Sequence, residues 1–141
     1  MWKGIWNLQV PQKVKHMLWS AANEVIPTLY NLMCRNVVKS TYCPNCKDAC
    51  EDTICALWGC QMLVVIWGAN EELKRLIKYK FHAFADFLEL VFLMKDRIDV
   101  NLLAITLWLI WNKRTNDRVG STFLDFHLIQ AKVEILFQDF Q

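Results

Sequence analysis

The sequence lacks the glycine motifs that bind nucleotide phosphates, any internal repeat, and a strict alternation of apolar and polar residues. Without GxGxxG or GxxxxGK, nothing in it indicates a dinucleotide-binding or P-loop enzyme. Without two-residue alternation, the pattern does not predict half-buried β-strands. The periodic segments follow a helical repeat instead. We therefore predict a small all-α protein.

A surplus of charge of one sign is also missing. The 16 Lys and Arg residues against 14 Asp and Glu residues give a net charge of +2, which argues neither for nor against a nucleic-acid partner. The charges are unevenly placed. Residues 1–47 carry six basic groups against Glu24 alone, giving +5, whereas residues 48–72 carry five acidic groups and no basic one, giving −5. The amino-terminal third is therefore the basic third.

Targeting signals are absent as well. Residues 1–6 contain no continuous apolar core and no small-residue cleavage site, so we expect an intracellular protein of the nucleus or cytoplasm, with thiols in place of disulfides. The longest uncharged run, residues 53–70, is at the lower length limit for a membrane-spanning helix. Because Gly59, Gln61 and two cysteines interrupt its apolar character, a buried helix is the better interpretation, and no membrane association is expected.

Apolar residues make up 55% of the chain, which is enough to build a sizeable core. Residues 11–22 have apolar side chains at helical spacing, and Pro27 opens a second short helix, so these two predict an amino-terminal helical hairpin. In that second helix Cys34 falls on the apolar side and should be buried. Asn70 is a candidate N-cap for a later helix. Further helices are expected over residues 55–67, 71–80, 84–92 and 100–111, and from Thr122 onward.

Four cysteines have the spacing of a zinc site. Cys43 and Cys46 form a CxxC pair in a polar, aperiodic loop, and Cys55 and Cys60 follow close behind. Two close pairs of thiolates joined by a short connection can surround a tetrahedral Zn²⁺. Structural thiols without metal and a redox CxxC remain alternatives, although no strand precedes this CxxC as it does in redox proteins. Cys50 is a rival of Cys55 for one ligand position.

A series of short motifs runs in order through residues 2–67 and carries a resemblance. The motifs are Trp2-Lys-Gly-Ile-Trp6, Val10-Pro-Gln-Lys-Val-Lys15, Leu18-Trp19, Ile26-Pro-Thr28, Leu32, Arg35, Cys43-Pro-Asn-Cys46, Glu51-Asp-Thr53, Ala56-Leu-Trp58, Cys60 and Trp67. Together they resemble the zinc-binding domain of reverse transcriptases from plant non-LTR retrotransposons. Downstream, Trp108-Leu-Ile-Trp-Asn-Lys-Arg114 resembles the WxIWxxRN helix that often follows that domain, before a ribonuclease H region.

The chain departs from the family pattern at two positions. Cys55 stands where the family usually has His, which gives a site of four cysteines in place of three cysteines and a histidine. Thiolate and imidazole are both zinc ligands, so zinc binding should survive the change. Thr115 stands where the family has Asn after Arg114.

The resemblance implies a zinc-binding domain over residues 1–69 and a helical carboxy-terminal region over residues 70–141, with a zinc-stapled loop between the hairpin and a carboxy-terminal bundle. It implies a non-catalytic piece of a reverse transcriptase, because neither paired polymerase aspartates nor a ribonuclease H carboxylate cluster has a place in this helical pattern. His16, His82 and His127 are scattered and have no catalytic partner at motif spacing.

By analogy with the family, the module would contact RNA or DNA. The candidates for phosphate contact are Lys13, Lys15, Arg35 and Lys39, all in the basic third. The alternative is a protein-interaction scaffold that packs against the reverse transcriptase or ribonuclease H domains of a parent element, or self-associates through exposed Trp residues. A remnant of a truncated retroelement without function is a further alternative.

Overall fold

The computed structural model describes residues 2–35 and 51–118, and all structural statements below refer to them. Every regular element in these two ranges is helical, which confirms the all-α fold class. Segments predicted within residues 36–50 and 119–141, including the helix from Thr122, lie outside the described residues. The elements are α1 Trp2–Trp6, α2 Gln12–Ala22, α3 Leu29–Cys34, η1 Cys55–Gly59, η2 Gln61–Leu63, α4 Val64–Trp67, α5 Glu71–Leu76, α6 Phe84–Leu93 and α7 Val100–Arg118.

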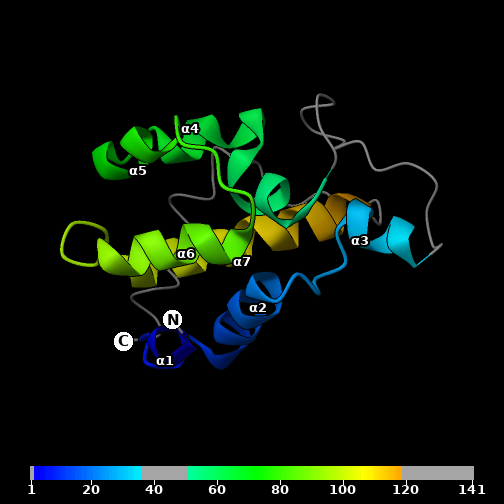
Figure 1. Cartoon of the computed structure of the whole chain (residues 1–141), viewed down its shortest axis with the longest axis horizontal. Helices are drawn as coiled ribbons and strands as arrows, with labels where there is room; N and C mark the ends of the chain where they lie inside the picture. The colour runs from blue at the N-terminus through cyan, green and yellow to red at the C-terminus, as the bar shows by residue number, and fades with distance from the viewer. Residues whose placement is uncertain (1, 36–50, 119–141) are drawn as a thin grey trace.

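The helices are arranged in three tiers, with α1 and α2 at one side, α6 and α7 in the middle, and α4 and α5 at the other side (Figure 1). Helix α2 packs against α1, α6 and α7. Pro11 precedes it with φ −56°, a value that proline favours and that suits a helix start. The apolar positions predicted to face the core are all buried: Val14, Met17, Leu18, Ala21 and Ala22.

The end of α2 is a Schellman turn in which Glu24 has φ 60°, a left-handed conformation that glycine usually occupies. The Val25 amide donates to the Ser20 carbonyl at 3.0 Å, and the Glu24 amide donates to the Ala21 carbonyl at 3.0 Å. The Glu24 carboxylate then accepts the Phe84 amide at 3.4 Å. This turn therefore connects the end of α2 with the start of α6.

Helix α7 is the long apolar helix expected over residues 100–111, and it continues to Arg118. It packs against α2 on one side and against η1 on another. At its start, the Asn101 side chain accepts the Gln9 amide at 2.9 Å. Apolar side chains around most of its circumference are buried, from Leu103 to Ile110. Such a helix is stable only in the interior of a fold, because all its faces need apolar neighbours.

One apolar core runs through the described residues on both sides of the predicted boundary between residues 69 and 70. Val14 and Leu57 from the first side belong to the same cluster as Phe87 and Ile110 from the second. The ring of Trp58 lies 4.4 Å from that of Phe87, centroid to centroid. The boundary stays a prediction, and the packing gives both predicted regions a common core.

The helix predicted over residues 55–67 is wrong in its continuity. The segment forms a π-helix, a 3₁₀-helix and a short α-helix, with an extended Cys60 (ψ 134°) between the first two. A straight helix with apolar residues on all sides needs apolar neighbours around its whole circumference. The breaks turn the chain so that Leu63, Ile66 and Trp67 are buried, while Met62, Val64 and Val65 remain exposed.

The burial predicted for Cys34 is also wrong, because this side chain is exposed. On α2, Trp19 is 41% exposed. Helix α3 has no fully buried residue. Its position is fixed by hydrogen bonds at its first turn, described below, so the apolar side chains of this short helix need not pack closely.

The N-cap prediction at Asn70 is confirmed. Its side chain accepts the amides of Glu72 and Leu73 at 2.9 and 3.1 Å, and two glutamates occupy the first turn of α5, where the helix dipole stabilises negative charge. Across residues 2–35 and 51–118, no helix has both the length and the apolar character needed to cross a membrane.

Candidate functional site

Two of the four predicted zinc ligands lie at opposite ends of a single turn. Cys55 begins the π-helix η1, and the Cys60 amide closes that turn by donating to the Cys55 carbonyl at 3.2 Å. Both residues are buried, with 7% and 2% of their surfaces exposed. The wide π-turn accounts for the spacing of five residues, because its hydrogen bond spans five positions where an α-helical bond spans four. The structure therefore brings Cys55 and Cys60 to one short element.

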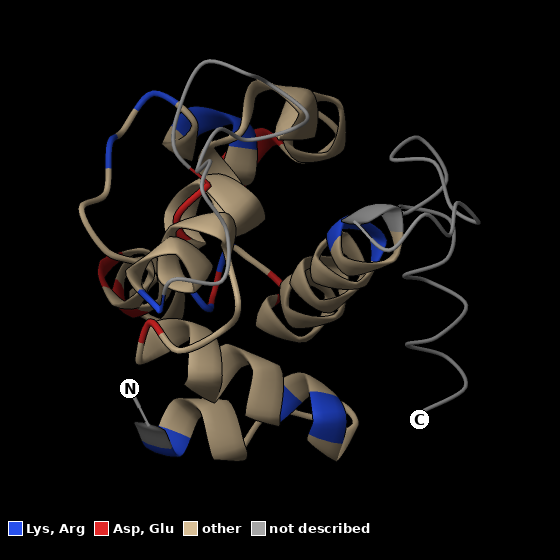
Figure 2. Ribbon diagram, turned by 90° about the vertical axis from the view of Figure 1, so that its right-hand side faces the viewer, with Lys and Arg blue, Asp and Glu red and all other residues tan. Residues whose placement is uncertain are grey.

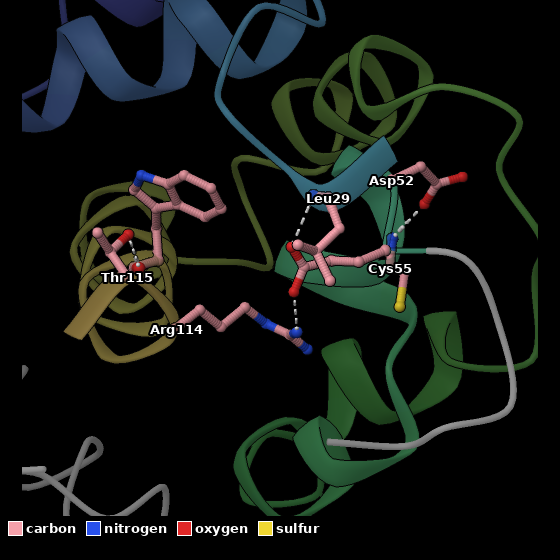
Figure 3. A network of polar contacts seen from close by, with 7 residues as sticks. Leu29, Asp52, Cys55, Arg114 and Thr115 are labelled. Carbon is pink, nitrogen blue, oxygen red and sulfur yellow. Dashed lines mark hydrogen bonds and ion pairs between the residues drawn. The ribbon is translucent and has the colours of Figure 1, made fainter. Parts of the chain in front are cut away.

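The turn is held in place from its amino-terminal side by Asp52. One carboxylate oxygen of Asp52 accepts the Cys55 amide at 2.9 Å (Figure 3), and the Asp52 carbonyl accepts the Ala56 amide at 2.9 Å. An aspartate in this position satisfies amides that have no partner within the turn. The backbone of Cys55 is thus fixed by a neighbour that is not itself a predicted ligand.

Glu51 lies one residue before this cap and forms a buried ion pair. One of its oxygens accepts from the Arg114 guanidinium at 3.0 Å, and both side chains are 0% exposed. The other oxygen accepts the Leu29 amide at 3.0 Å, so contacts from α3 and α7 meet at one carboxylate (Figure 3). A buried charge is tolerated only when it is paired and hydrogen-bonded, and the Glu51 carboxylate meets both conditions.

Glu51 and Thr28 together satisfy the first three amides of α3. The Leu29 amide bonds to the Glu51 carboxylate, the Tyr30 amide to the Glu51 carbonyl at 3.0 Å, and the Asn31 amide to the Thr28 hydroxyl at 3.2 Å. These bonds join the chain just before residues 36–50 to the chain just after them. The first turn of α3 is therefore bonded to the residue at which the described chain resumes.

The metal site itself is only partly described. Cys43, Cys46 and the rival ligand Cys50 lie outside the described residues, and within residues 2–35 and 51–118 no group of three or more His, Cys, Asp or Glu side chains could hold a metal ion. The donor chemistry of the described part fits zinc, since Cys55 and Cys60 supply two buried sulfur ligands from one turn. A tetrahedral site would need two further ligands.

The described residues that were predicted to contact phosphate come from α2 and from the end of α3. The Lys13 amine lies 4.5 Å from the ring centroid of Trp108, and the Lys15 amine donates to the Trp6 carbonyl at 2.9 Å, so both have partners within the fold. Arg35 is exposed at the end of α3. Lys39 lies outside the described residues.

The ion pair between Glu51 and Arg114 is the feature that sequence reasoning missed. Both residues stand within motifs singled out in the sequence, but 63 positions separate them and no periodicity connects them. No signal in the sequence indicated it, because Arg114 lies in the polar stretch of residues 112–118 at the end of α7, where a solvated side chain is expected. At the next position Thr115 donates its hydroxyl to the Trp111 carbonyl at 2.9 Å, within its own helix.

Comparison with known proteins gives one match. Residues 1–67 match the model of a family described as zinc-binding in reverse transcriptase. No curated protein and no solved structure matched the chain. The match supports a reverse transcriptase zinc-binding domain in the first part of the chain, and it covers no catalytic domain. It includes all four predicted zinc ligands and Glu51, and it ends before α5.

Proposed function

We propose that the chain is a zinc-binding, non-catalytic module derived from the reverse transcriptase of a plant non-LTR retrotransposon, with one Zn²⁺ held by Cys43, Cys46, Cys55 and Cys60. The observation that carries the proposal is the pair of buried thiols at the ends of η1, within the part of the chain that matches the zinc-binding family. Bound zinc would supply folding free energy to the segment that carries its ligands.

The absence of catalysis follows from the same ligand set. Four cysteine ligands leave no open coordination position for water or substrate, which is the arrangement of structural zinc sites. Glu51 is a buried carboxylate four residues before Cys55, and it already accepts hydrogen bonds from the Leu29 amide and the Arg114 guanidinium. Its role is therefore to position the chain, not to activate water.

Metal analysis of the purified full chain tests the zinc site. We expect about one zinc per chain in the wild type and a loss of most of it in Cys60→Ser, since four thiolates complete a structural site. Cys34→Ser is the matched control, because Cys34 is exposed on α3 and should retain its metal content. Equal zinc contents in Cys60→Ser and the wild type, or none in the wild type, would overturn the proposal.

The proposed partner is RNA or DNA, contacted by Lys13, Lys15, Arg35 and Lys39. The +5 charge of residues 1–47 supports this proposal, as do the exposed positions of Lys13 and Arg35. Phosphate contacts without base readout give an affinity that falls steeply as salt rises. Since Lys13 and Lys15 also contact Trp108 and Trp6, their replacement would disturb packing too.

Arg35 therefore gives the cleaner test. We expect Arg35→Gln to weaken binding of single-stranded or structured RNA in a gel-shift assay and to lower the salt dependence, while Lys95→Gln, an exposed cation outside the basic third, leaves both unchanged. Zinc-loaded protein that shows no salt-sensitive shift at micromolar concentration would remove nucleic acid from the proposal.

A second candidate function is a protein-interaction scaffold. Trp6 and Trp19 are 37% and 41% exposed on α1 and α2, and Leu93 at the end of α6 is 81% exposed. Exposed side chains of this size favour contact with another domain of a parent element or with a second copy of the chain. Light scattering separates the candidates, because a zinc-loaded oligomer indifferent to RNA supports the scaffold and a monomer that binds RNA supports the first function.

A further inference from the structure

A cleft of about 460 Å³ opens beside the turn that carries Cys55 and Cys60. Its lining includes Cys55 and Cys60 themselves, Trp58 and Trp67, and, from the chain after α5, Ile77, Tyr79, Lys80 and Phe81. The two indole rings lie 4.8 Å apart, and the Trp67 indole N–H donates to the Trp58 carbonyl at 3.0 Å. Both residues are buried, so their rings are fixed in place beneath the cleft. The volume falls in the range of sites that bind small molecules, about 300 to 1,000 Å³.

The lining also has an exposed aromatic ring. Tyr79 lines the cleft and is 55% exposed, although its neighbour Phe81 is half-buried and packs edge-on against Phe87 at 5.5 Å. The Lys78 amine lies 5.8 Å from the Tyr79 ring centroid. The cleft therefore has a buried aromatic wall, a partly exposed aromatic rim and a cation at that rim.

The same stretch of chain is strongly basic. Residues 73–80 contain four cations and no acidic residue. Arg75 is paired with Glu72 at 3.3 Å, whereas Lys80 lines the cleft and is exposed. Among the described residues of the lining, Asp52 is the one acidic side chain, and its carboxylate is bonded to the backbone of η1. Figure 2 shows the basic segments of α5 and the connection after it at the opposite end of the molecule from those of α1 and α2.

We propose that this cleft binds an unpaired base of single-stranded RNA or DNA, with the base stacked on Tyr79 and the adjoining phosphates beside Lys78 and Lys80. A flat apolar ring linked to an anionic backbone matches an aromatic cleft with a cationic rim. Paired bases do not present their faces, so a duplex does not fit. This site rests on the proposed nucleic-acid function, but it lies apart from the basic third assigned to that function.

RNA and DNA carry the same stacking and phosphate chemistry, so the test includes both. The protein is the full zinc-loaded chain, and the probes are labelled oligouridine and oligothymidine of about eight nucleotides, a length typical of single-stranded sites. Binding is measured by fluorescence anisotropy between about 50 and about 200 mM salt. A third probe of the same length carries abasic positions and retains only the backbone.

We expect Tyr79→Ala to weaken binding of the base-containing probes about tenfold and to leave the abasic probe unaffected, since stacking on one aromatic side chain contributes about that factor. Tyr79→Phe keeps the ring and should bind as the wild type does. The double variant Lys78→Gln, Lys80→Gln should reduce the steepness of the salt dependence by about 1.4. Tyr30→Ala is the matched control, because Tyr30 is an exposed tyrosine on α3, outside the lining of this cleft.

Three outcomes would overturn the proposal that the cleft binds an unpaired base. They are equal affinity of Tyr79→Ala and the wild type, equal losses on abasic and base-containing probes, and a loss in Tyr30→Ala as large as that in Tyr79→Ala. If Arg35→Gln still weakens binding in that case, the proposed function stands and the cleft alone fails. If the wild-type chain binds none of the probes, the nucleic-acid function fails with it. A preference for oligouridine over oligothymidine identifies RNA as the partner, and the reverse identifies DNA.

Discussion

The Glu51 carboxylate and the Arg114 guanidinium are 3.0 Å apart, and neither side chain reaches solvent. Glu51 lies within the part of the chain that matches the zinc-binding family, whereas Arg114 lies on α7, 47 residues beyond its end at residue 67. Because the same carboxylate also bonds to the first amide of α3, one residue connects both helices to the start of the cysteine turn. The pair joins the matched part of the chain to α7, with α5 and α6 between them in the sequence.

Removing one partner of this pair should destabilise the fold strongly. Arg114→Met leaves the Glu51 carboxylate buried without its cation, and Glu51→Ala leaves the guanidinium buried without its anion. Each single change should lower the free energy of unfolding by about 3 to 5 kcal/mol, mainly because a buried charge loses its compensation. Urea denaturation followed by tryptophan fluorescence measures the loss.

The control is the exposed pair of Glu72 and Arg75, whose side chains are 24% and 67% accessible. Arg75→Gln should cost less than about 1 kcal/mol, since water screens an ion pair of this kind. A loss in Arg114→Met no larger than that in Arg75→Gln would contradict the role assigned to the buried pair.

Residues 1–69 alone should fail to fold. Without the following helices, the inward faces of Val14 and Leu57 lose Phe87 and Ile110 as core neighbours, and Glu51 loses Arg114. Exposure of apolar surface costs about 25 cal/mol per Å², whereas the whole stability of a small domain is only about 5 to 15 kcal/mol. We expect the fragment with zinc to bind a hydrophobic dye and to melt without a cooperative transition, whereas the full chain melts cooperatively. Cooperative melting of the fragment would support the predicted boundary at residue 69.

The regular part of the fold was predictable and the exceptions have physical causes. Periodicity located α2, α6 and α7, and the cap at Asn70 located the start of α5, because these signals depend only on neighbours within a few positions. The breaks around Cys60 were not predictable, since they depend on which faces the rest of the fold can cover.

The site was predictable to a smaller extent. Spacing selected Cys55 and Cys60, which the structure places at the ends of one turn, while Cys43 and Cys46 stay predictions. The pairing of Glu51 with Arg114 and the cleft beside Tyr79 depend on contacts between distant parts of the chain. Lys13 and Lys15 were predicted to contact phosphate because of their charge alone. Their contacts with Trp108 and Trp6 depend on the fold, so the sequence could not predict them.

At position 24, glycine should be better tolerated than alanine. Its φ of 60° is unfavourable for a residue with a Cβ and favourable for glycine. Glu24→Gly and Glu24→Ala both remove the carboxylate that accepts the Phe84 amide. The difference between their free energies of unfolding therefore reports the cost of the left-handed backbone conformation alone. We expect the glycine variant to be more stable than the alanine variant by about 1 kcal/mol in thermal or urea denaturation. Equal stabilities would indicate that the turn relaxes when the side chain is shortened.

Exchange of one zinc ligand for another should preserve the metal site. Cys55→His introduces the residue that the resembled family usually has at this position, and imidazole is a zinc ligand, whereas Cys55→Ala removes the ligand altogether. We expect metal analysis to find close to one zinc per chain in the histidine variant and much less in the alanine variant. The histidine variant should unfold at a somewhat lower temperature than the wild type, because Cys55 is 7% exposed and a larger ring must be accommodated there.

A chelator separates the effect of the metal from the effect of the side chain. Removal of zinc should lower the melting temperature of the wild type and of Cys55→His, since a ligand that binds only the folded state stabilises it, and should leave that of Cys55→Ala nearly unchanged. If Cys55→Ala kept its zinc and its response to the chelator, the ligand would be Cys50, the rival in the sequence, and Cys50→Ala would then lose the metal instead.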